Sequence, residues 1–339
     1  TLFRAGGFVC TPPPSSGGRG PGRGTQGWAR LTATQAGREL WAMTIRRPAS
    51  SSGAWGSGVE LSDVRYRGKR VLEIGHLPIL NVEYTGGTCG PYRDWQWQEN
   101  PFRVGPTVRD LATGVRIVQW AKTMRELGDD AGNFSGVAIA WDAAHRQVVI
   151  ISELEAGWYR YMSEWRFSAD GTINPRFGFD AVDNWCTCQE HTHHSYWRLD
   201  FALGGGNNRF QWREGGGPWN PIDTERSDVR NDAGGREWRV VDEASGDAYL
   251  IRPVPGEDVV DAYGVADAWF LRTRSTEADD SGASAPFPTA AGLNSFVNGE
   301  SVRDVDNVLW WGGHFLHNDA LPTTNQTHTV QLQLIPDSW

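Results

Sequence analysis

Short runs of β-branched and aromatic residues, separated by turn-forming residues, recur along most of this 339-residue chain. Such runs are typical of strands, and 18 tryptophans and 41 glycines against 3 methionines favour strands and turns over helices. Only two short helices are predicted, over residues 121–127 and residues 290–296, the second with Thr289 as its cap. The predicted strands are Trp41–Ile45, Val71–Ile74, Val115–Trp120, Gly136–Trp141, Val148–Ile151, Trp238–Val241, Val308–Trp311 and Thr329–Leu334. We therefore predict a mainly β protein that folds as a large antiparallel β-sandwich.

The N-terminal residues differ in composition from the rest of the chain. Residues 11–26 read TPPPSSGGRGPGRGTQ, which offers almost no apolar surface to bury. We expect residues 1–26 to form an arm or linker. We expect residues 27–339 to form one β-sandwich domain, because no similar break in composition follows.

Charge and hydropathy limit the partners of the chain. Its formal net charge of −9 lacks the basic surface that phosphate backbones require, so nucleic acid is not an expected partner. The mean hydropathy is −0.49 and the apolar runs are short, so we expect no membrane-spanning helix. Charge and hydropathy therefore exclude these two classes of partner without naming the partner that the chain does bind. The start at Thr1 and the Asn-x-Ser/Thr sequons at Asn133 and Asn325 lead us to expect a secreted or periplasmic protein.

A dense group of metal-binding side chains lies in residues 186–194, which read CTCQEHTHH. On a strand, His191 and His193 point to one face and His194 to the other, because the side-chain period is two. Residues 310–317, WWGGHFLH, supply further histidines in an aromatic setting. Imidazoles suit Cu(II), and also Zn²⁺ or Fe²⁺. The pattern predicts a mononuclear metal site, and its alternative is a pair of histidines that share a strand face without a metal.

Residues 191–200, HTHHSYWRLD, resemble without a gap the His-x-His and Arg-Leu-Asp signature of the copper amine oxidases. In that family the two histidines bind Cu(II), and a third follows a Trp by a fixed interval on a strand near the C-terminus. The resemblance places His191 and His193 on the first two ligands and His317, after Trp310, on the third. It leaves the remaining C-terminal histidines, His314 and His328, without a role.

Two further segments resemble the family in the expected order. Residues 157–173, GWYRYMSEWRFSADGTI, resemble the segment whose tyrosine becomes the quinone cofactor topaquinone, and they place Tyr159 on that tyrosine. Trp158 stands where the family has Asn, and Arg160 stands where it has an acid. Residues 61–72, LSDVRYRGKRVL, resemble the family's entry hairpin. Continued without a gap, this match places Tyr84 on the tyrosine that hydrogen-bonds the quinone oxygen.

The resemblance leaves the catalytic base open among three residues. In the family the base is an aspartate that lies a short interval after the tyrosine matched by Tyr84. Spacing favours Gln98 or Glu99, whereas residue type allows Asp94.

Asp200 and Asp306 match two carboxylates that hold a peripheral ion of the Ca²⁺ type in many family members. Ala202 replaces a further acid of that site. The resemblance therefore predicts a weakened or absent calcium site.

Four cysteines allow one or two disulfides. Cys186 and Cys188 lie just before the copper pair, and they could supply soft metal ligands or form a disulfide with Cys10 or Cys89. A bridge between Cys186 and Cys188 themselves would be strained.

The resemblance implies a copper-dependent oxidase that deaminates a primary amine through a quinone derived from Tyr159, in a chain that could form a homodimer. One alternative is a copper protein of the same fold in which Tyr159 stays unmodified and the metal performs another O₂-dependent oxidation. Another is a non-catalytic binding module, because β-sandwiches rich in Trp and Gly often bind glycans or protein partners.

Overall fold

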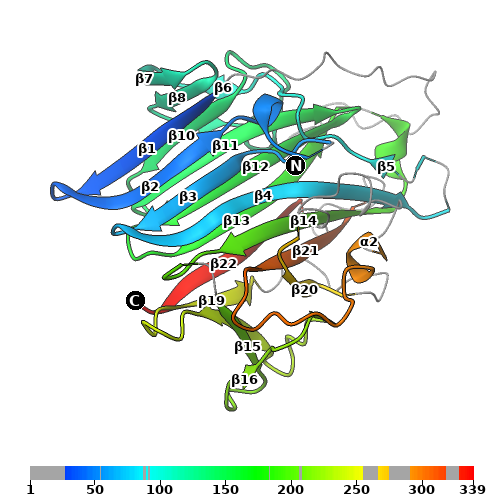
Figure 1. Ribbon diagram of the computed structural model, residues 1–339. Helices are drawn as coiled ribbons and strands as arrows, with labels where there is room; N and C mark the ends of the chain where they lie inside the picture. Colours follow the sequence, from blue (N-terminus) through cyan, green and yellow to red (C-terminus); the bar gives the residue numbers. More distant parts are fainter. Residues whose placement is uncertain are drawn as a thin grey trace.

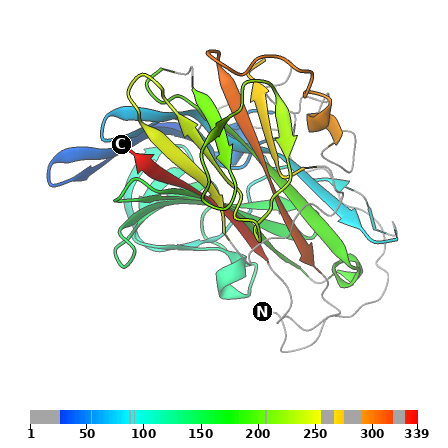
Figure 2. The same ribbon diagram turned by 90° about the horizontal axis from the view of Figure 1, so that it is seen from below.

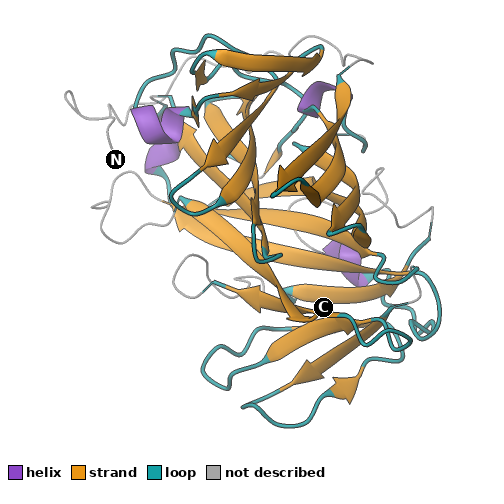
Figure 3. Ribbon diagram, turned by 90° about the vertical axis from the view of Figure 1, so that its left-hand side faces the viewer, coloured by secondary structure: helices purple, strands orange, loops and turns teal. Residues whose placement is uncertain are grey.

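Two β-sheets lie face to face in the computed structural model of this protein, and helices contribute only short pieces (Figure 1, Figure 3). The structure describes residues 27–53, 55–86, 89–90, 92–182, 184–205, 208–254, 266–274, 291–317 and 328–339. The prediction of a mainly β fold with a large antiparallel sandwich is confirmed. The predicted arm over residues 1–26, the cap Thr289 and the sequon at Asn325 lie outside the described residues.

The first sheet contains nine strands and carries most of the predicted metal ligands. In spatial order it consists of β1 (Trp28–Gln35), β2 (Arg38–Arg46), β3 (Glu60–Tyr66), β4 (Lys69–Tyr84), β14 (His191–Phe201), β21 (Asn307–His317), β20 (Ala268–Arg272) and β17 (Arg226–Asp228), with β5 (Tyr92–Arg93) beside β4. The predicted entry hairpin is the pair β3 and β4. Its turn, Arg67-Gly68, has φ values of 51° and 82°, a left-handed conformation that glycine favours.

The second sheet contains eleven strands and carries Tyr159. Its order is β16 (Asn220–Pro221), β15 (Arg209–Arg213), β18 (Glu237–Val241), β19 (Ala248–Pro253), β22 (Thr329–Ser338), β13 (Ile173–Ala181), β12 (Tyr159–Ser168), β11 (Gln147–Ala156), β10 (Val137–Asp142), β8 (Val115–Val118) and β7 (Thr107–Ala112). Its neighbouring strands pair antiparallel, apart from the parallel pair β8 and β10. Seen from below, the C-terminal strand β22 (red) runs through the centre of the molecule (Figure 2).

The eight predicted strands each overlap an observed strand, but several ends differ: β4 extends ten residues beyond Ile74, β21 extends six residues beyond Trp311, and β8 ends two residues before Trp120. The first predicted helix shortens to α1 (Met124–Leu127), because Ala121–Lys122 forms β9 and pairs with β6 (Arg103–Val104). The backbone N–H of Thr123 donates to Glu126 Oε2 at 2.8 Å, as in a capping box. The other helical pieces are the 3₁₀ turns η1 (Pro48–Ser50) and η2 (Trp185–Cys188) and the helix α2 (Ala291–Asn294). No helix among the described residues is long and apolar enough to span a membrane.

The core fills the space between the two sheets, because alternate residues of each strand point inwards. Trp165 on β12, Trp197 on β14 and Trp311 on β21 are all fully buried there. Complete burial of a large apolar side chain contributes on the order of 2 kcal/mol, so these residues stabilise the sheet pairing strongly. The sandwich therefore supplies a rigid frame for the strand ends described below.

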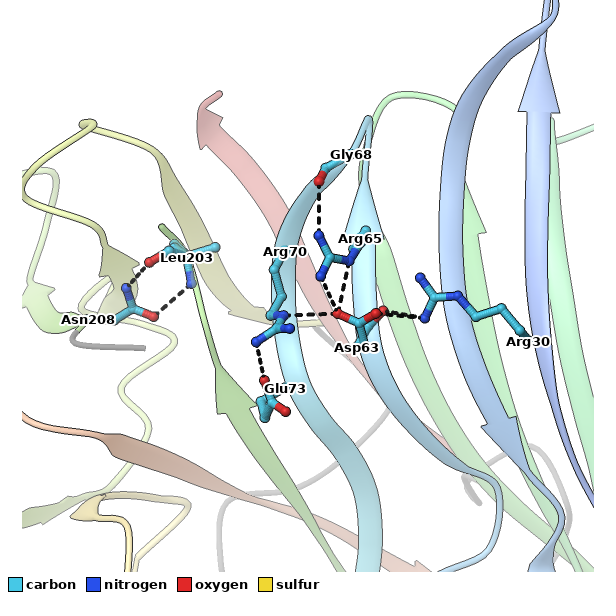
Figure 4. A network of polar contacts seen from close by, with 8 residues as sticks. All are labelled: Arg30, Asp63, Arg65, Gly68, Arg70, Glu73, Leu203 and Asn208. Atoms are coloured by element: carbon cyan, nitrogen blue, oxygen red, sulfur yellow. Dashed lines mark hydrogen bonds and ion pairs between the residues drawn. The ribbon is translucent and has the colours of Figure 1, made fainter. Parts of the chain in front are cut away.

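Charged residues occupy the solvent-facing side of the first hairpins. Asp63 accepts hydrogen bonds from Arg30 at 2.8 Å and from Arg65 and Arg70 at 2.9 Å, and Arg70 also pairs with Glu73 (Figure 4). These side chains are about a third or more exposed, so water screens their attraction. The network orders the surface, whereas the core provides the stability.

Candidate metal centre and active site

Three neighbouring strands of the first sheet bring Tyr84, His191 and His317 side by side. His191 opens β14, and it pairs in register with Tyr84 at the end of β4 and with His317 at the end of β21. His193 follows two residues later on the same face. All four side chains are buried. The prediction that His191 and His193 share one face of a strand, with His194 on the other, is confirmed by their contacts.

Tyr159 reaches this group from the facing sheet, where it is the first residue of β12. Its hydroxyl lies 2.5 Å from the hydroxyl of Tyr84 and 2.9 Å from His191 Nε2. Its ring packs edge-on against His193, with 4.8 Å between ring centroids. Burial raises the pKa of the Tyr159 phenol well above its usual value, and the neighbouring Tyr84 adds to this rise. Tyr159 is therefore a neutral phenol in contact with a histidine cluster.

The imidazoles of the three predicted copper ligands lie close together, with ring centroids 5.0 Å apart for His191 and His193 and 4.9 Å apart for His191 and His317. His317 Nδ1 lies 3.2 Å from His191 Nε2. His193 Nε2 is buried and has no hydrogen-bond partner among the residues that the structure describes. Burial lowers the pKa of His193 well below its usual value, and the histidines around it add to this effect. Neutral imidazole is the form that binds transition metals.

These residues fit a copper ion in their chemistry. Two nitrogens that bind one metal at about 2.0 Å lie about 3 Å apart, which is close to the separation between His191 Nε2 and His317 Nδ1. The unpartnered Nε2 of His193 supplies a third donor nearby. Within the described part of the chain, no three His, Cys, Asp or Glu side chains are already arranged around one ion position. The residues therefore fit copper in the types of donor atom and in the spacing of one pair of nitrogens, but the three imidazoles do not surround a common ion position.

A pocket of about 160 Å³ lies beside Tyr159. Its lining combines aromatic rings, small residues and one carboxylate: Tyr92, Asp94, Trp95, Ala156, Gly157, Trp158 and Tyr159. Burial raises the pKa of Asp94 to about 7, although the hydrogen bond from Tyr161 and the charge of Arg93 lower it. A carboxyl group that titrates near neutral pH can accept a proton from a bound molecule.

The other two base candidates lie outside this pocket. Glu99 forms an ion pair with Arg47 and accepts a hydrogen bond from the backbone N–H of Ala49 at 3.1 Å. Gln98 Oε1 accepts a hydrogen bond from Trp95 Nε1 at 3.1 Å. Neither residue lines the pocket. Of the three candidates, the structure brings only Asp94 to the pocket beside Tyr159.

The two residues that differ from the family pattern around Tyr159 have different neighbours. Trp158 lies at the turn between β11 and β12, and its ring centroid is 5.8 Å from that of Tyr159. Arg160 instead pairs with Asp130 at 2.8 Å and lies near Glu155. Trp158 therefore adds bulk at the phenol, whereas the Arg160 guanidinium is engaged by acids away from it.

The predicted calcium ligands lie beside an arginine. Asp200 accepts a hydrogen bond from Arg198 at 3.3 Å, and burial together with the charge of Asp306 raises the pKa of Asp200 to about 6. Asp306 is exposed, and the apolar Ala202 is buried. Arg198 thus already supplies a positive charge to Asp200.

A disulfide between Cys89 and Cys186 joins the loop after β4 to η2, directly before β14. It is one of the two pairings that the sequence left open for Cys186. Cys188 is also disulfide-bonded, and the structure contains no free cysteine among its described residues. The alternative in which these cysteines are soft metal ligands is therefore wrong, because their sulfurs are oxidised. Cys10 lies outside the described residues.

Two residues at the site were not identified from the sequence. Tyr161 lies next to His193 and Asp94, and its same-face position two residues after Tyr159 was an available signal. The ring of His328 lies 4.7 Å from that of His317, although the resemblance gave it no role. His328 directly precedes β22, which pairs with β13 in the sheet opposite the ligands. Only this long-range pairing brings it to the site.

Solved structures with a similar fold include several amine oxidases. The lysyl oxidase of Pichia pastoris shares 14% identity over 88% of this chain and 52% of its own, with a TM-score of 0.59. The amine oxidase of Aspergillus nidulans shares 16% identity over 87% of this chain and 50% of its own, with a TM-score of 0.60. The copper-containing benzylamine oxidase of Hansenula polymorpha shares 13% identity over 95% of this chain and 63% of its own, with a TM-score of 0.61. At these identities the likeness shows the fold, and the chain spans about half to two thirds of the length of these proteins. No family model and no curated protein matches the sequence.

Proposed function

We propose that this protein is a copper-dependent oxidase that deaminates a primary amine oxidatively. One observation carries the proposal: the phenol of Tyr159 hydrogen-bonds His191 while its ring lines the pocket that also contains Asp94. Tyr159 thus connects a histidine cluster to a small cavity that contains a carboxylate. The fold shared with amine oxidases supports this interpretation.

His191, His193 and His317 would hold the copper, which would supply the O₂-dependent redox chemistry for oxidation of the Tyr159 ring to a quinone. Tyr84 holds the Tyr159 oxygen through their hydroxyl contact at 2.5 Å. That contact limits the positions of the ring at the wall of the pocket. Over a full turnover, amine, O₂ and water are consumed, and aldehyde, ammonia and hydrogen peroxide are released.

Asp94 is the group that accepts the proton from the carbon next to the amine nitrogen. It lines the pocket with Tyr159, and its pKa of about 7 leaves about half of it ionised at neutral pH. Tyr92, Trp95 and Trp158 offer ring faces that bind the apolar part or the cationic form of an amine. The small volume and aromatic wall favour a compact amine over a long or branched one.

The disulfide between Cys89 and Cys186 supports the proposal that the protein works in an oxidising compartment, as a secreted or periplasmic protein does.

The mass of the peptide that contains Tyr159 tests the proposed function. Copper-loaded and aerated protein should give the mass of the quinone form, and phenylhydrazine should label this peptide. The same preparation should release hydrogen peroxide when a small aromatic primary amine is added. An unmodified tyrosine after copper and O₂ treatment would exclude amine oxidation through a quinone.

The copper oxidase with an unmodified tyrosine is the second candidate, and the position of Trp158 favours it. Its indole packs beside Tyr159 and edge-on against Tyr92, which reduces the space in which the Tyr159 ring can turn. In that case the protein would bind copper and consume O₂ with a reducing substrate, while Tyr159 keeps its ordinary mass.

A further inference from the structure

Tyr161, which takes no part in the proposed reaction, lies between Asp94 and His193. Its hydroxyl donates a hydrogen bond to Asp94 Oδ2, and the same oxygen lies 3.4 Å from His193 Nδ1. Its ring stacks on Phe177 with 5.3 Å between centroids. All these side chains are buried. A polar chain therefore runs from the pocket to a predicted metal ligand through an otherwise aromatic core.

Two aromatic rings fix the orientation of His193. The ring of Phe179 stacks on the imidazole at 4.1 Å, and the ring of Phe315 does so at 5.0 Å, with interplanar angles of 24° and 11°. A rotation of the imidazole would drive it into both rings. Nδ1 therefore stays on the side of Tyr161, while Nε2 has no hydrogen-bond partner among the described residues.

The hydrogen-bonding capacities of Asp94 and Tyr161 determine which ring nitrogen of His193 carries the hydrogen. When Asp94 is ionised, its carboxylate can only accept, so the Tyr161 hydroxyl donates to Asp94. The phenol oxygen then has only lone pairs to offer to His193, so Nδ1 carries the hydrogen and Nε2 carries the lone pair.

His191 supports this assignment by a different route. Its Nδ1 lies 2.6 Å from the backbone carbonyl oxygen of Gln189, which can only accept. Nδ1 of His191 therefore carries the hydrogen, and its Nε2 lies towards Tyr159 and His317. Both histidines of the pair thus carry a lone pair on Nε2. For His191 a main-chain carbonyl oxygen fixes this tautomer, and for His193 the side chains of Tyr161 and Asp94 do so.

We propose that Tyr161 is a positioning residue that, together with Asp94, holds His193 as the Nδ1–H tautomer and so directs its Nε2 lone pair to the metal position. The metal part of this inference rests on the proposed function, whereas the tautomer is a property of the metal-free protein. Groups that orient a ligand in this way usually change metal affinity about 10- to 100-fold when they are removed.

The first experiment measures the tautomer directly, without any metal. The full chain is labelled with ¹⁵N-histidine, metal is removed by a chelator, and the His193 signals are assigned by their loss in His193→Gln. At a pH at which Asp94 is ionised, the wild type should show the Nδ1–H form, and Tyr161→Phe should lose it in favour of Nε2–H or a mixture. An Nε2–H form in the wild type, or an unchanged tautomer in Tyr161→Phe, would overturn the proposal.

The second experiment measures Cu²⁺ affinity by competition with a chelator. Tyr161→Phe should bind Cu²⁺ about 10- to 100-fold more weakly. Adding Asp94→Asn to Tyr161→Phe should weaken binding no further, because Asp94 reaches His193 only through the Tyr161 hydroxyl. The matched control is Tyr249→Phe, which removes another buried hydroxyl, bonded to the carbonyl oxygen of Gly171, and should leave the affinity unchanged.

The outcomes separate the proposed function from this inference. If the wild type binds no Cu²⁺ but shows the Tyr161-dependent tautomer, the proposed function fails and the positioning role stands. If the wild type binds Cu²⁺ and Tyr161→Phe binds it equally well with the same tautomer, only the positioning role fails. A loss of thermal stability in Tyr161→Phe with no change in the tautomer would show a packing role alone and would also overturn the proposal.

Discussion

The two faces of strand β14 carry adjacent histidines in different surroundings. On the inner face, His193 lies among Tyr159, Tyr161 and the other predicted ligands. On the outer face, His194 Nδ1 lies 2.7 Å from His314 Nδ1. His314 Nε2 is 3.6 Å from an Asp267 oxygen. Both faces are buried, hold more than one imidazole and adjoin a tyrosine, since Tyr196 packs on His314. The inner tyrosine, Tyr159, differs because it hydrogen-bonds a predicted metal ligand and lines the pocket that contains Asp94.

This difference shows that a count of histidines does not define a site. The outer imidazoles can satisfy each other, because one donates to the other across two paired strands. The inner histidines instead contact Tyr159, which lines the pocket beside Asp94. If this difference matters, copper binding and oxidation of a tyrosine should depend on the inner face of β14 and not on the outer one.

Replacing the two adjacent histidines in turn should give the largest contrast. His193→Ala should abolish stoichiometric copper binding, because it removes one of three imidazole donors. His194→Ala should keep the copper, although it leaves a buried partner at His314 and lowers the unfolding free energy by about 1–3 kcal/mol. Elemental analysis of dialysed protein measures the copper content, and thermal melts measure the stability. Full copper content in His193→Ala would exclude the assignment of that residue as a ligand.

The next contrast compares two buried tyrosines, one on each side of the first sheet. Tyr159→Phe should remove the visible absorption band and the phenylhydrazine reaction of copper-loaded, aerated protein, while the copper stays bound. Tyr196→Phe changes a buried tyrosine that packs on His314 and Trp269, and it should leave both responses in place. Equal responses in Tyr159→Phe and the wild type would show that the oxidised ring, if one forms, is elsewhere.

The disulfide should matter more for the inner site than for the outer pair. It closes a separation of 97 residues and ties the segment before His191 to the loop after Tyr84. The double variant Cys89→Ala/Cys186→Ala should lose up to about 4.7 kcal/mol of unfolding free energy, because the unfolded chain gains freedom. Its copper affinity should also fall. Denaturant titration and chelator competition measure the two effects, and an unchanged affinity would show that the strands alone position Tyr84 and His191.

The sequence predicted which residues on regular strands belong to this site better than it predicted which distant segments come together there. Alternation along a strand places His191 and His193 on one face, because that period is a local property of the backbone. The match to Trp310 placed His317 on a strand near the C-terminus, and pairing of β14 with β21 brings it to His191. These residues lie on regular strands, where spacing in sequence translates directly into direction in space.

The residues that the sequence left open lie in irregular segments or depend on distant pairing. Spacing favoured Gln98 or Glu99 as the base, but the segment after β5 is a loop without a fixed period, and its turn brings Asp94 to the pocket instead. His328 reaches His317 only through the pairing of β13 with β22. The choice of Cys89 as the partner of Cys186 likewise follows from tertiary proximity.

The last contrast compares two buried carboxyl groups with similarly raised pKa values. Burial raises the pKa of Asp94 to about 7 and that of Asp200 to about 6, so each is protonated in slightly acidic solution, unlike an exposed aspartate. If Asp94 is the base, only its ionised form accepts the substrate proton, and kcat/KM should fall about tenfold for each pH unit below about 7. Above that pH the rate should level off, because the carboxylate is then fully formed.

Asp200 serves as the matched control because it has a similarly raised pKa but contacts Arg198 rather than the pocket. Asp94→Asn should remove both the activity and its dependence on this titration, whereas Asp200→Asn should keep the wild-type pH profile. Copper content is measured at each pH, so that loss of metal is not mistaken for protonation of the base. A wild-type profile that is flat between pH 5.5 and 7.5 at constant copper content, a window set by the usual spread of about one unit around such pKa values, would remove Asp94 from the reaction. Such a result would leave Asp94 only its hydrogen bond with Tyr161. The next candidate for the base would then be a group of the incoming amine itself.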